Sequence, residues 1–178
     1  GTIYGSPIWQ EGTEIVIDEC CYDPDNDIDG DGVCGDVDDC PNDYTTLTNV
    51  TITENTAALC GGGMNIEKSS PSLTNVIITE NEVTYYEGSW WGGGGIRLHQ
   101  SHPILTNVTI SGNTAGNEGG GIRMEQRSFP IFTFVTISGN MSGIEGGGIF
   151  IEPPDNINYP GTYPTLTNSI IWDNYPQS

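Results

Sequence analysis

The sequence has few basic residues. Four lysines and arginines stand against 24 aspartates and glutamates, which gives the 178-residue chain a formal net charge of -20 at pH 7. Such a chain is repelled by nucleic acids and by anionic membrane surfaces. We therefore expect no nucleic-acid partner, and the acidic composition favours cations as ligands.

Long hydrophobic runs are also missing. No apolar stretch approaches the about 20 residues that a membrane-spanning helix needs, and no secretory signal peptide opens the sequence. Membrane insertion is therefore not expected. Because the chain begins at Gly1 rather than at methionine, we expect a processed product or part of a longer protein.

What is present is one motif that occurs five times. Leu-Thr-Asn followed by valine and isoleucine starts at Leu47, Leu73, Leu105 and Leu166, and a degraded copy starts at Phe132. The copies begin 26, 32, 27 and 34 residues apart, so two of them carry insertions. Short β-branched runs at a fixed period, without helical spacing, indicate a solenoid whose turns pack only against their neighbours.

Apolar residues recur at fixed positions within the copies. Threonines and serines alternate with them, which is the pattern of half-buried strands, and a further apolar pattern follows each glycine run. We therefore predict three short strands in each turn. The predicted inward columns are Leu47, Leu73, Leu105, Phe132 and Leu166; Val50, Val76, Val108 and Val135; Ile52, Ile78, Ile110, Ile137 and Ile171; Met64, Ile96, Ile122 and Ile149; and Ile66, Leu98, Met124 and Ile151.

Asparagines recur at two further positions. Asparagine tolerates left-handed backbone at a bend, and stacked amides can hydrogen-bond along a solenoid, so we interpret both columns as corner ladders. Three sequons, at Asn49, Asn107 and Asn140, fall on these ladders, and N-glycosylation is therefore not expected. The columns are Asn55, Asn81, Asn113, Asn140 and Asn174, and Asn49, Asn75, Asn107 and Asn168.

These repeats, with their Gly-Gly-x-Ile and x-x-x-Asn elements, resemble a known architecture. They are similar to the right-handed parallel β-helix of the pectate-lyase-like superfamily, and more narrowly to repeats of bacterial polymorphic outer-membrane and surface proteins. The resemblance covers residues 44–178 and implies an all-β solenoid of about five coils. The fold carries lyases, hydrolases, adhesins and passive stalks, so it does not assign a function.

Residues 23–43 form an acidic segment, preceded by a lead-in region of residues 1–22 in which residues 14–18 predict a strand. Oxygen ligands at alternate positions, with a glycine for the sharp turn, suit calcium. Twelve-residue registers begin at Asp25 and Asp27, but neither ends in glutamate and no helices flank them, so an EF-hand is not expected. The predicted calcium ligands are Asp23, Asp25, Asp27, Asp29, Asp31, Asp36, Asp38 and Asp39.

The acidic segment resembles a thrombospondin type 3 repeat through Asp27-x-Asp29-x-Asp31-Gly32-Val33 and the ending Asp38-Asp39-Cys40-Pro41. The resemblance implies an irregular calcium-binding loop that holds several ions. Asp36 stands one residue later than the pattern expects, Asp39 replaces the usual asparagine, and Cys34 is additional. The alternative is a solvated acidic linker, which would stay disordered through its own repulsion.

The five cysteines favour an oxidising, extracellular setting. Adjacent cysteines rarely bond to one another, so one of Cys20 and Cys21 can reach Cys60, while Cys34 and Cys40 can close a small disulfide. Pairings of Cys34 or Cys40 with Cys20 or Cys21 stay open. The odd total leaves one thiol free or bonded to another chain.

The strand after each glycine run is the candidate location for catalytic residues. Arg97 and Arg123 lie beside His99 and Glu125 in the predicted outward columns, where they could abstract a proton from an acidic sugar. The resemblance to β-helix lyases implies calcium-binding aspartates on the same sheet as the catalytic arginine or lysine. No aspartate falls in these columns. The competing interpretation is a solvated ladder of charges that compensate one another across turns.

Two insertions, residues 83–91 and 153–163, are rich in aromatic residues. Such loops usually fold back on their own scaffold, and sugar stacking or contact with another protein is the alternative. The candidate contact residues are Tyr85, Tyr86, Trp90 and Trp91, together with Arg97 and Arg123.

The function expected from the sequence is structural, not enzymatic. Neither end of the solenoid shows a cap, and open strand edges recruit further strands. We expect a calcium-stabilised unit of an extracellular filament, fibre or cell-surface stalk. Its partners would be itself, stacked head to tail with Ile3, Tyr4 and Ile8 completing the coil of the preceding unit, or the flanking coils of a longer chain. The alternative is a polysaccharide lyase, hydrolase or sugar-binding adhesin module.

Overall fold

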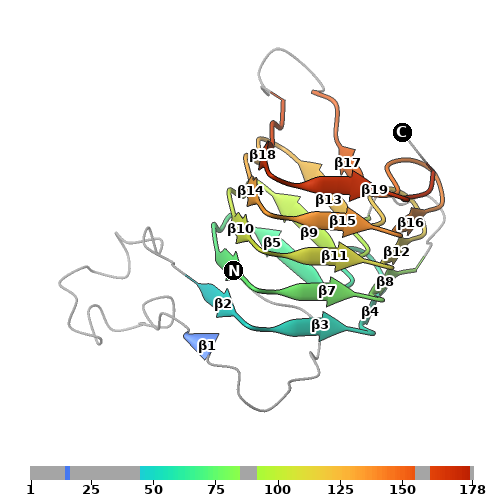
Figure 1. Ribbon diagram of the computed structural model, residues 1–178. Helices are drawn as coiled ribbons and strands as arrows, with labels where there is room; N and C mark the ends of the chain where they lie inside the picture. The colour runs from blue at the N-terminus through green and yellow to red at the C-terminus, as the bar shows by residue number, and fades with distance from the viewer. Residues whose placement is uncertain (1–14, 17–44, 85–91, 155–160, 177–178) are drawn as a thin grey trace, which may run out of the picture.

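The computed structural model describes residues 15–16, 45–84, 92–154 and 161–176, and all regular structure in these ranges is β-strand (Figure 1). No helix long and apolar enough to cross a membrane occurs in them. The predicted all-β class is therefore confirmed. The acidic segment, with its predicted calcium ligands, lies outside the described residues.

Successive turns add one strand to each of four sheets, so the chain winds into a parallel β-helix. The first sheet contains β1 (Ile15–Val16), β2 (Thr46–Thr48), β6 (Ser72–Thr74), β10 (Ile104–Thr106), β14 (Ile131–Thr133) and β18 (Thr165–Thr167). The second contains β3 (Thr51–Thr53), β7 (Ile77–Thr79), β11 (Thr109–Ser111), β15 (Thr136–Ser138) and β19 (Ile170–Trp172). The third contains β4 (Thr56–Ala57), β8 (Glu82–Val83), β12 (Thr114–Ala115) and β16 (Met141–Ser142). The fourth contains β5 (Met64–Glu67), β9 (Ile96–His99), β13 (Ile122–Glu125) and β17 (Ile149–Ile151).

A complete turn therefore has four strands, and the prediction of three was wrong. The strands of the third sheet have two residues each and turn a single side chain inward, such as Ala115 in β12. One inward position cannot produce an alternating pattern, so sequence periodicity does not detect these strands.

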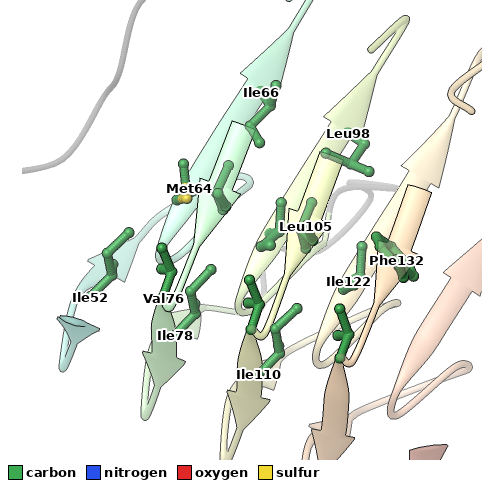
Figure 2. Packing of buried hydrophobic residues seen from close by; sticks show 14 of the residues in the cluster. Ile52, Met64, Ile66, Val76, Ile78, Leu98, Leu105, Ile110, Ile122 and Phe132 are labelled. Carbon is green, nitrogen blue, oxygen red and sulfur yellow. The ribbon is translucent and has the colours of Figure 1, made fainter. Parts of the chain in front are cut away.

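The strand register confirms the predicted columns. Leu105 of β10 pairs with Leu73 and Phe132 in the adjacent turns, and Ile110 of β11 pairs with Ile78 and Ile137. The close-up view shows members of both columns on neighbouring turns, Leu105 with Phe132 and Ile78 with Ile110 (Figure 2). Burying each leucine or isoleucine contributes about 1.5–3 kcal/mol, which explains why the same apolar residue types recur in each turn.

The inner asparagine column is a buried ladder, as predicted. Asn113 donates from Nδ2 to Asn140 Oδ1 at 2.9 Å and to the Ile78 carbonyl at 2.9 Å. Its own Oδ1 accepts from the backbone N–H and Nδ2 of Asn81, both at 3.0 Å. These asparagines do not have left-handed backbone, contrary to the prediction; the residue before each one does, for example Gly112 with φ 64°.

The outer asparagine column lies at the corner between the first and second sheets. Asn75 donates from Nδ2 to Asn49 Oδ1 at 3.1 Å, and Asn107 donates to Asn75 Oδ1 at 2.8 Å. These three asparagines are exposed and have φ between 53° and 58°. The predicted left-handed corner is therefore confirmed for this ladder.

The glycine runs lie where successive turns approach most closely. A Cβ on Gly121 would come within 2.5 Å of the Gly148 carbonyl oxygen in the next turn, and one on Gly120 within 2.4 Å of the Met141 carbonyl oxygen. Because both obstacles are backbone, no side-chain movement can relieve the clash. The glycines therefore set the tight stacking that places the fourth sheet.

The two ends of the described solenoid differ. At the first turn, β1 pairs antiparallel with β2 and covers that edge of the first sheet, so the expectation of an uncovered end is wrong for this sheet. In the last turn, Leu166 and Ile171 are 41% and 47% exposed, whereas Phe132 and Ile137 below them are 0% and 1% exposed. The core columns therefore run open at the last described turn.

Candidate functional site

The strongest candidate site is a charged cluster around the fourth sheet. Its members lie on or beside strands β5, β9, β13 and β17, whose pairing places Arg97 next to Arg123 and His99 next to Glu125. We define the charged cluster as Glu67, Arg97, His99, Glu118, Arg123, Glu125 and Glu152.

Arg97 occupies the middle of the charged cluster. Its Nε donates to Glu125 Oε1, its Nη1 donates to Asn65 Oδ1 at 3.1 Å, and Nη1 lies 3.6 Å from Glu67 Oε2. Its Nη2 lies 3.2 Å from His99 Nδ1. Because a guanidinium only donates, His99 Nδ1 accepts this bond and the imidazole proton is on Nε2.

Arg123 bridges three glutamates. Its Nη1 donates to Glu118 Oε2, and its Nη2 lies 3.7 Å from Glu125 Oε2 and 3.5 Å from Glu152 Oε1. The guanidinium carbon lies 5.2 Å from the centroid of the Phe150 ring, within the range of a cation–π contact. The Arg123 Nε is buried and has no hydrogen-bond partner within the ranges that the structure describes.

Burial distinguishes this cluster from the solvated ladder considered above. The side chains of Arg97 and Arg123 are 6% and 4% exposed, and that of Glu125 is 9% exposed. These three side chains are therefore not solvated, but the expected compensation of charge across turns is confirmed, for example between Arg97 and Glu125. Removing one partner of a buried pair typically costs about 3–5 kcal/mol because the other charge is left uncompensated, so these residues matter for stability whatever else they do.

The formal charges of the cluster do not cancel. Two arginines face four glutamates, so with His99 neutral the cluster has two more negative than positive charges. An acidic sugar would bring further negative charge to this surface, which opposes its binding. The residual charge favours a neutral or cationic ligand.

Two titratable groups in or near the cluster are shifted in pKa. Burial, with the positive charge of Arg97, lowers the pKa of His99 below its usual value, which keeps the imidazole neutral near pH 7. Burial also raises the pKa of the Cys60 thiol, against a smaller opposing effect of Arg97. Cys60 is therefore held as the weakly nucleophilic thiol rather than as thiolate.

These contacts limit the chemistry that the cluster can perform. Both guanidinium groups are hydrogen-bonded to glutamates, Arg97 to Glu125 and Arg123 to Glu118. Glu125 is shared between both arginines, which leaves it poorly placed to take a proton from a substrate. The arrangement is better suited to fixing the fourth sheet than to proton abstraction.

The other predicted site residues lie mostly outside the described residues. This applies to Tyr85, Tyr86, Trp90 and Trp91, to the eight predicted calcium ligands, and to Cys20, Cys21, Cys34 and Cys40. Cys60 forms no disulfide with another described residue. Within the described ranges, no group of three or more histidine, cysteine, aspartate or glutamate side chains could hold a metal ion.

Glu118 was not predicted from the sequence as a member of the cluster. It lies in the turn before the glycine run, five residues from Arg123, with which it pairs, and turn glutamates show no strand periodicity. A stack of rings at the corner between the fourth and first sheets was not predicted either. The His102 and Phe129 centroids are 5.2 Å apart, and those of Phe129 and Tyr163 are 6.4 Å apart. The equal spacing of these residues before Pro103, Pro130 and Pro164 was the available signal.

Comparison with known proteins agrees with this geometry. A family model described as "Right handed beta helix region" matches residues 37–177. Searches of curated proteins and of solved structures gave no match. With parallel strands in register over successive turns and a match over most of its length, the chain belongs to the right-handed β-helix family.

Proposed function

We propose that this β-helix is a structural module that stacks end to end, as part of a secreted fibre or cell-surface stalk. The observation that carries the proposal is the open core at the last described turn. Leu166 and Ile171 continue columns that are buried in every complete turn below them. A further coil on this end, from another copy or from flanking coils of a longer chain, would bury these side chains.

The backbone at this end supports the same proposal. At the corner between the first and second sheets, the backbone N–H of each preceding turn donates to a backbone carbonyl of the next turn. Asn107 donates in this way to the Thr133 carbonyl and Phe134 to the Thr167 carbonyl, both within 3.1 Å. The equivalent amide of Asn168 has no acceptor among the described residues. An open strand edge of this kind is a template for pairing with another chain.

Calcium and an extracellular location form part of the proposal. The acidic residues 23–43 have the ligand type and spacing that calcium requires, and the cysteines suit an oxidising compartment. Calcium would stabilise the chain by binding the ordered form of this segment. Calorimetry of the 178-residue chain, with and without a chelator, tests this: binding heat and a higher melting temperature are expected, and neither would appear if the segment were a solvated linker.

End-to-end stacking is tested by substituting Ile171 with glutamate. Sedimentation velocity and electron microscopy of the parent chain should show assemblies that lengthen with concentration, and Ile171→Glu should abolish the lengthening because it places a charge on the open core. Ile144→Glu is the matched control, since Ile144 is similarly exposed but does not belong to a core column. A parent that does not lengthen at any concentration, with calcium or without, would refute head-to-tail stacking of copies.

One observation favours the carbohydrate-active alternative. The buried Arg123 Nε has no hydrogen-bond partner among the described residues, and a sugar hydroxyl that displaced the side chains covering it would be a suitable acceptor. Release of reducing ends or unsaturated products from pectin, alginate or glycosaminoglycans would support this alternative. Activity that survives Arg123→Gln would show that the charged cluster is not its site.

A further inference from the structure

Phe134 interrupts the outer asparagine ladder. The ladder runs in one direction, with Nδ2 of each asparagine donating to Oδ1 of the asparagine one turn earlier. Phe134 stands between Asn107 and Asn168 in this column, since Thr133 pairs with Thr167. Two hydrogen bonds that an asparagine would make at this position are therefore lost.

The backbone conformation and the solvent exposure of Phe134 are also unfavourable for stability. Phe134 has φ 56°, in the left-handed region, where a bulky residue is a genuine outlier. Its ring is also 56% exposed, although it gains no ladder contact in return. Conformational strain of this kind is characteristic of functional surfaces, where another requirement maintains it.

Further exposed apolar side chains lie on and beside the first sheet. Ile104 and Ile131 pair across β10 and β14, and each is 44% exposed. Phe129, in the ring stack with His102 and Tyr163, lies two residues before Ile131. We call these six residues the apolar strip: His102, Ile104, Phe129, Ile131, Phe134 and Tyr163.

The first sheet has no charged residue at any outward position of β2, β6, β10, β14 or β18. The outward positions of the second-sheet strands β3, β7, β11, β15 and β19 are uncharged as well, so copies with a net charge of -20 meet less repulsion over either of these two sheets than over the charged fourth sheet. An exposed apolar patch within a polar surface marks an interaction site.

The interrupted ladder leaves a donor and an acceptor on opposite sides of Phe134. Both side chains are exposed, and within the part of the chain that the structure describes Asn107 Oδ1 accepts no protein hydrogen bond and Asn168 Nδ2 donates none. A two-fold axis through Phe134, with the two solenoids antiparallel, exchanges these positions. Asn107 Oδ1 of one copy then faces Asn168 Nδ2 of the other, and the two Phe134 rings meet on the axis.

From this self-complementarity we propose that the apolar strip is the interface of a side-by-side, antiparallel dimer of this chain. Two-fold interfaces require each surface to match itself, with residue pairs occurring twice, and Asn107, Phe134 and Asn168 meet that requirement. The dimer contact is independent of the end-to-end stacking proposed above, because it lies on the side of the solenoid. High salt screens the repulsion between the acidic copies and should strengthen the dimer.

Phe134→Asn tests the proposal without the risk of unfolding. The variant restores both ladder hydrogen bonds and places a residue that tolerates left-handed backbone, so it should melt at a higher temperature than the parent. It should also be monomeric in sedimentation equilibrium, under conditions where the parent dimerises. Both chains carry Ile171→Glu, so that end-to-end growth does not contribute.

Ile144→Asn in the same background is the matched control. Ile144 is 53% exposed and lies in the turn after β16, away from the apolar strip, so its loss should leave dimerisation unchanged. A parent that remains monomeric at all accessible concentrations and salt levels, or a Phe134→Asn variant that dimerises as the parent does, would overturn the proposal.

Discussion

Replacing Asn113 by alanine should destabilise the protein strongly. The substitution removes four hydrogen bonds, two donated by Asn113 Nδ2 and two accepted by its Oδ1, all between 2.9 and 3.0 Å. The backbone N–H of Asn81, which is buried, donates to Asn113 Oδ1 and would lose that acceptor.

The magnitude follows from these contacts. Each lost hydrogen bond costs about 0.5–1.5 kcal/mol, and leaving a buried donor without an acceptor costs about 1–3 kcal/mol. Because the four bonds share atoms and partly compensate, we expect a loss of about 3–5 kcal/mol in the free energy of unfolding. For a chain of this length, that lowers the melting temperature by roughly 10 °C.

The matched control is Asn107→Gly, in the outer ladder of the same turn. Asn107 is exposed and makes one ladder bond as donor, to Asn75 at 2.8 Å, and glycine keeps its left-handed backbone without strain. A loss of at most about 1 kcal/mol is expected. Denaturant unfolding followed by circular dichroism measures both variants, and equal losses for Asn113→Ala and Asn107→Gly would refute the argument from burial.

Three further predictions concern the turns and the charged cluster. Gly121→Ala should prevent folding or lower the melting temperature severely. Gly112→Asn should change the melting temperature little, because the nearest atom to a Cβ at Gly112 is 3.7 Å away and asparagine tolerates the φ of 64° at this position. Similar melting temperatures for the two variants would show that the turns can separate. The lowered pKa of His99 contributes stability that is present above its usual pKa of about 6.5 and is lost as pH falls below that value. In melting curves between pH 5 and 8, His99→Gln should therefore lose part of the parent's sensitivity to acid. Identical pH profiles of the two chains would contradict the lowered pKa. The raised pKa of Cys60 predicts slow alkylation at pH 7 that accelerates only at alkaline pH, and a reaction as fast as that of a free thiol in an unfolded peptide would argue against burial.

The sequence was sufficient to predict the fold because aligning the repeats shows which positions keep the same type of residue in every turn. Columns such as Leu73, Leu105 and Phe132 identify the inward face without any structural information, and their register is confirmed. The same comparison identified the inner ladder, since Asn81, Asn113 and Asn140 share one position. The third sheet escaped detection because strands of two residues have no measurable period.

The charged cluster was only partly predictable. The sequence placed Arg97, Arg123 and His99 on neighbouring strands, but period-two alternation assigned their side chains to solvent. Their burial depends on Glu118, which comes from a turn, and on long side chains that cover one another across strands. Alternation describes which side of a strand a residue lies on, and it cannot report how much is packed against that side.

End-to-end stacking can be measured most directly at two backbone amides of the last described turn. The backbone N–H groups of Asn168 and Asp173 stand where Phe134 and Gly139 donate to the following turn, to the Thr167 and Asp173 carbonyls at 3.1 Å each. Amide hydrogen exchange, measured by NMR in dilute and concentrated samples of the chain, reports directly on these two groups. Stacking predicts fast exchange at both amides in the dilute sample and strong protection in the concentrated one. Both samples carry Phe134→Asn, so that dimerisation through the apolar strip does not contribute. Exchange that stays fast at every concentration would contradict the claim.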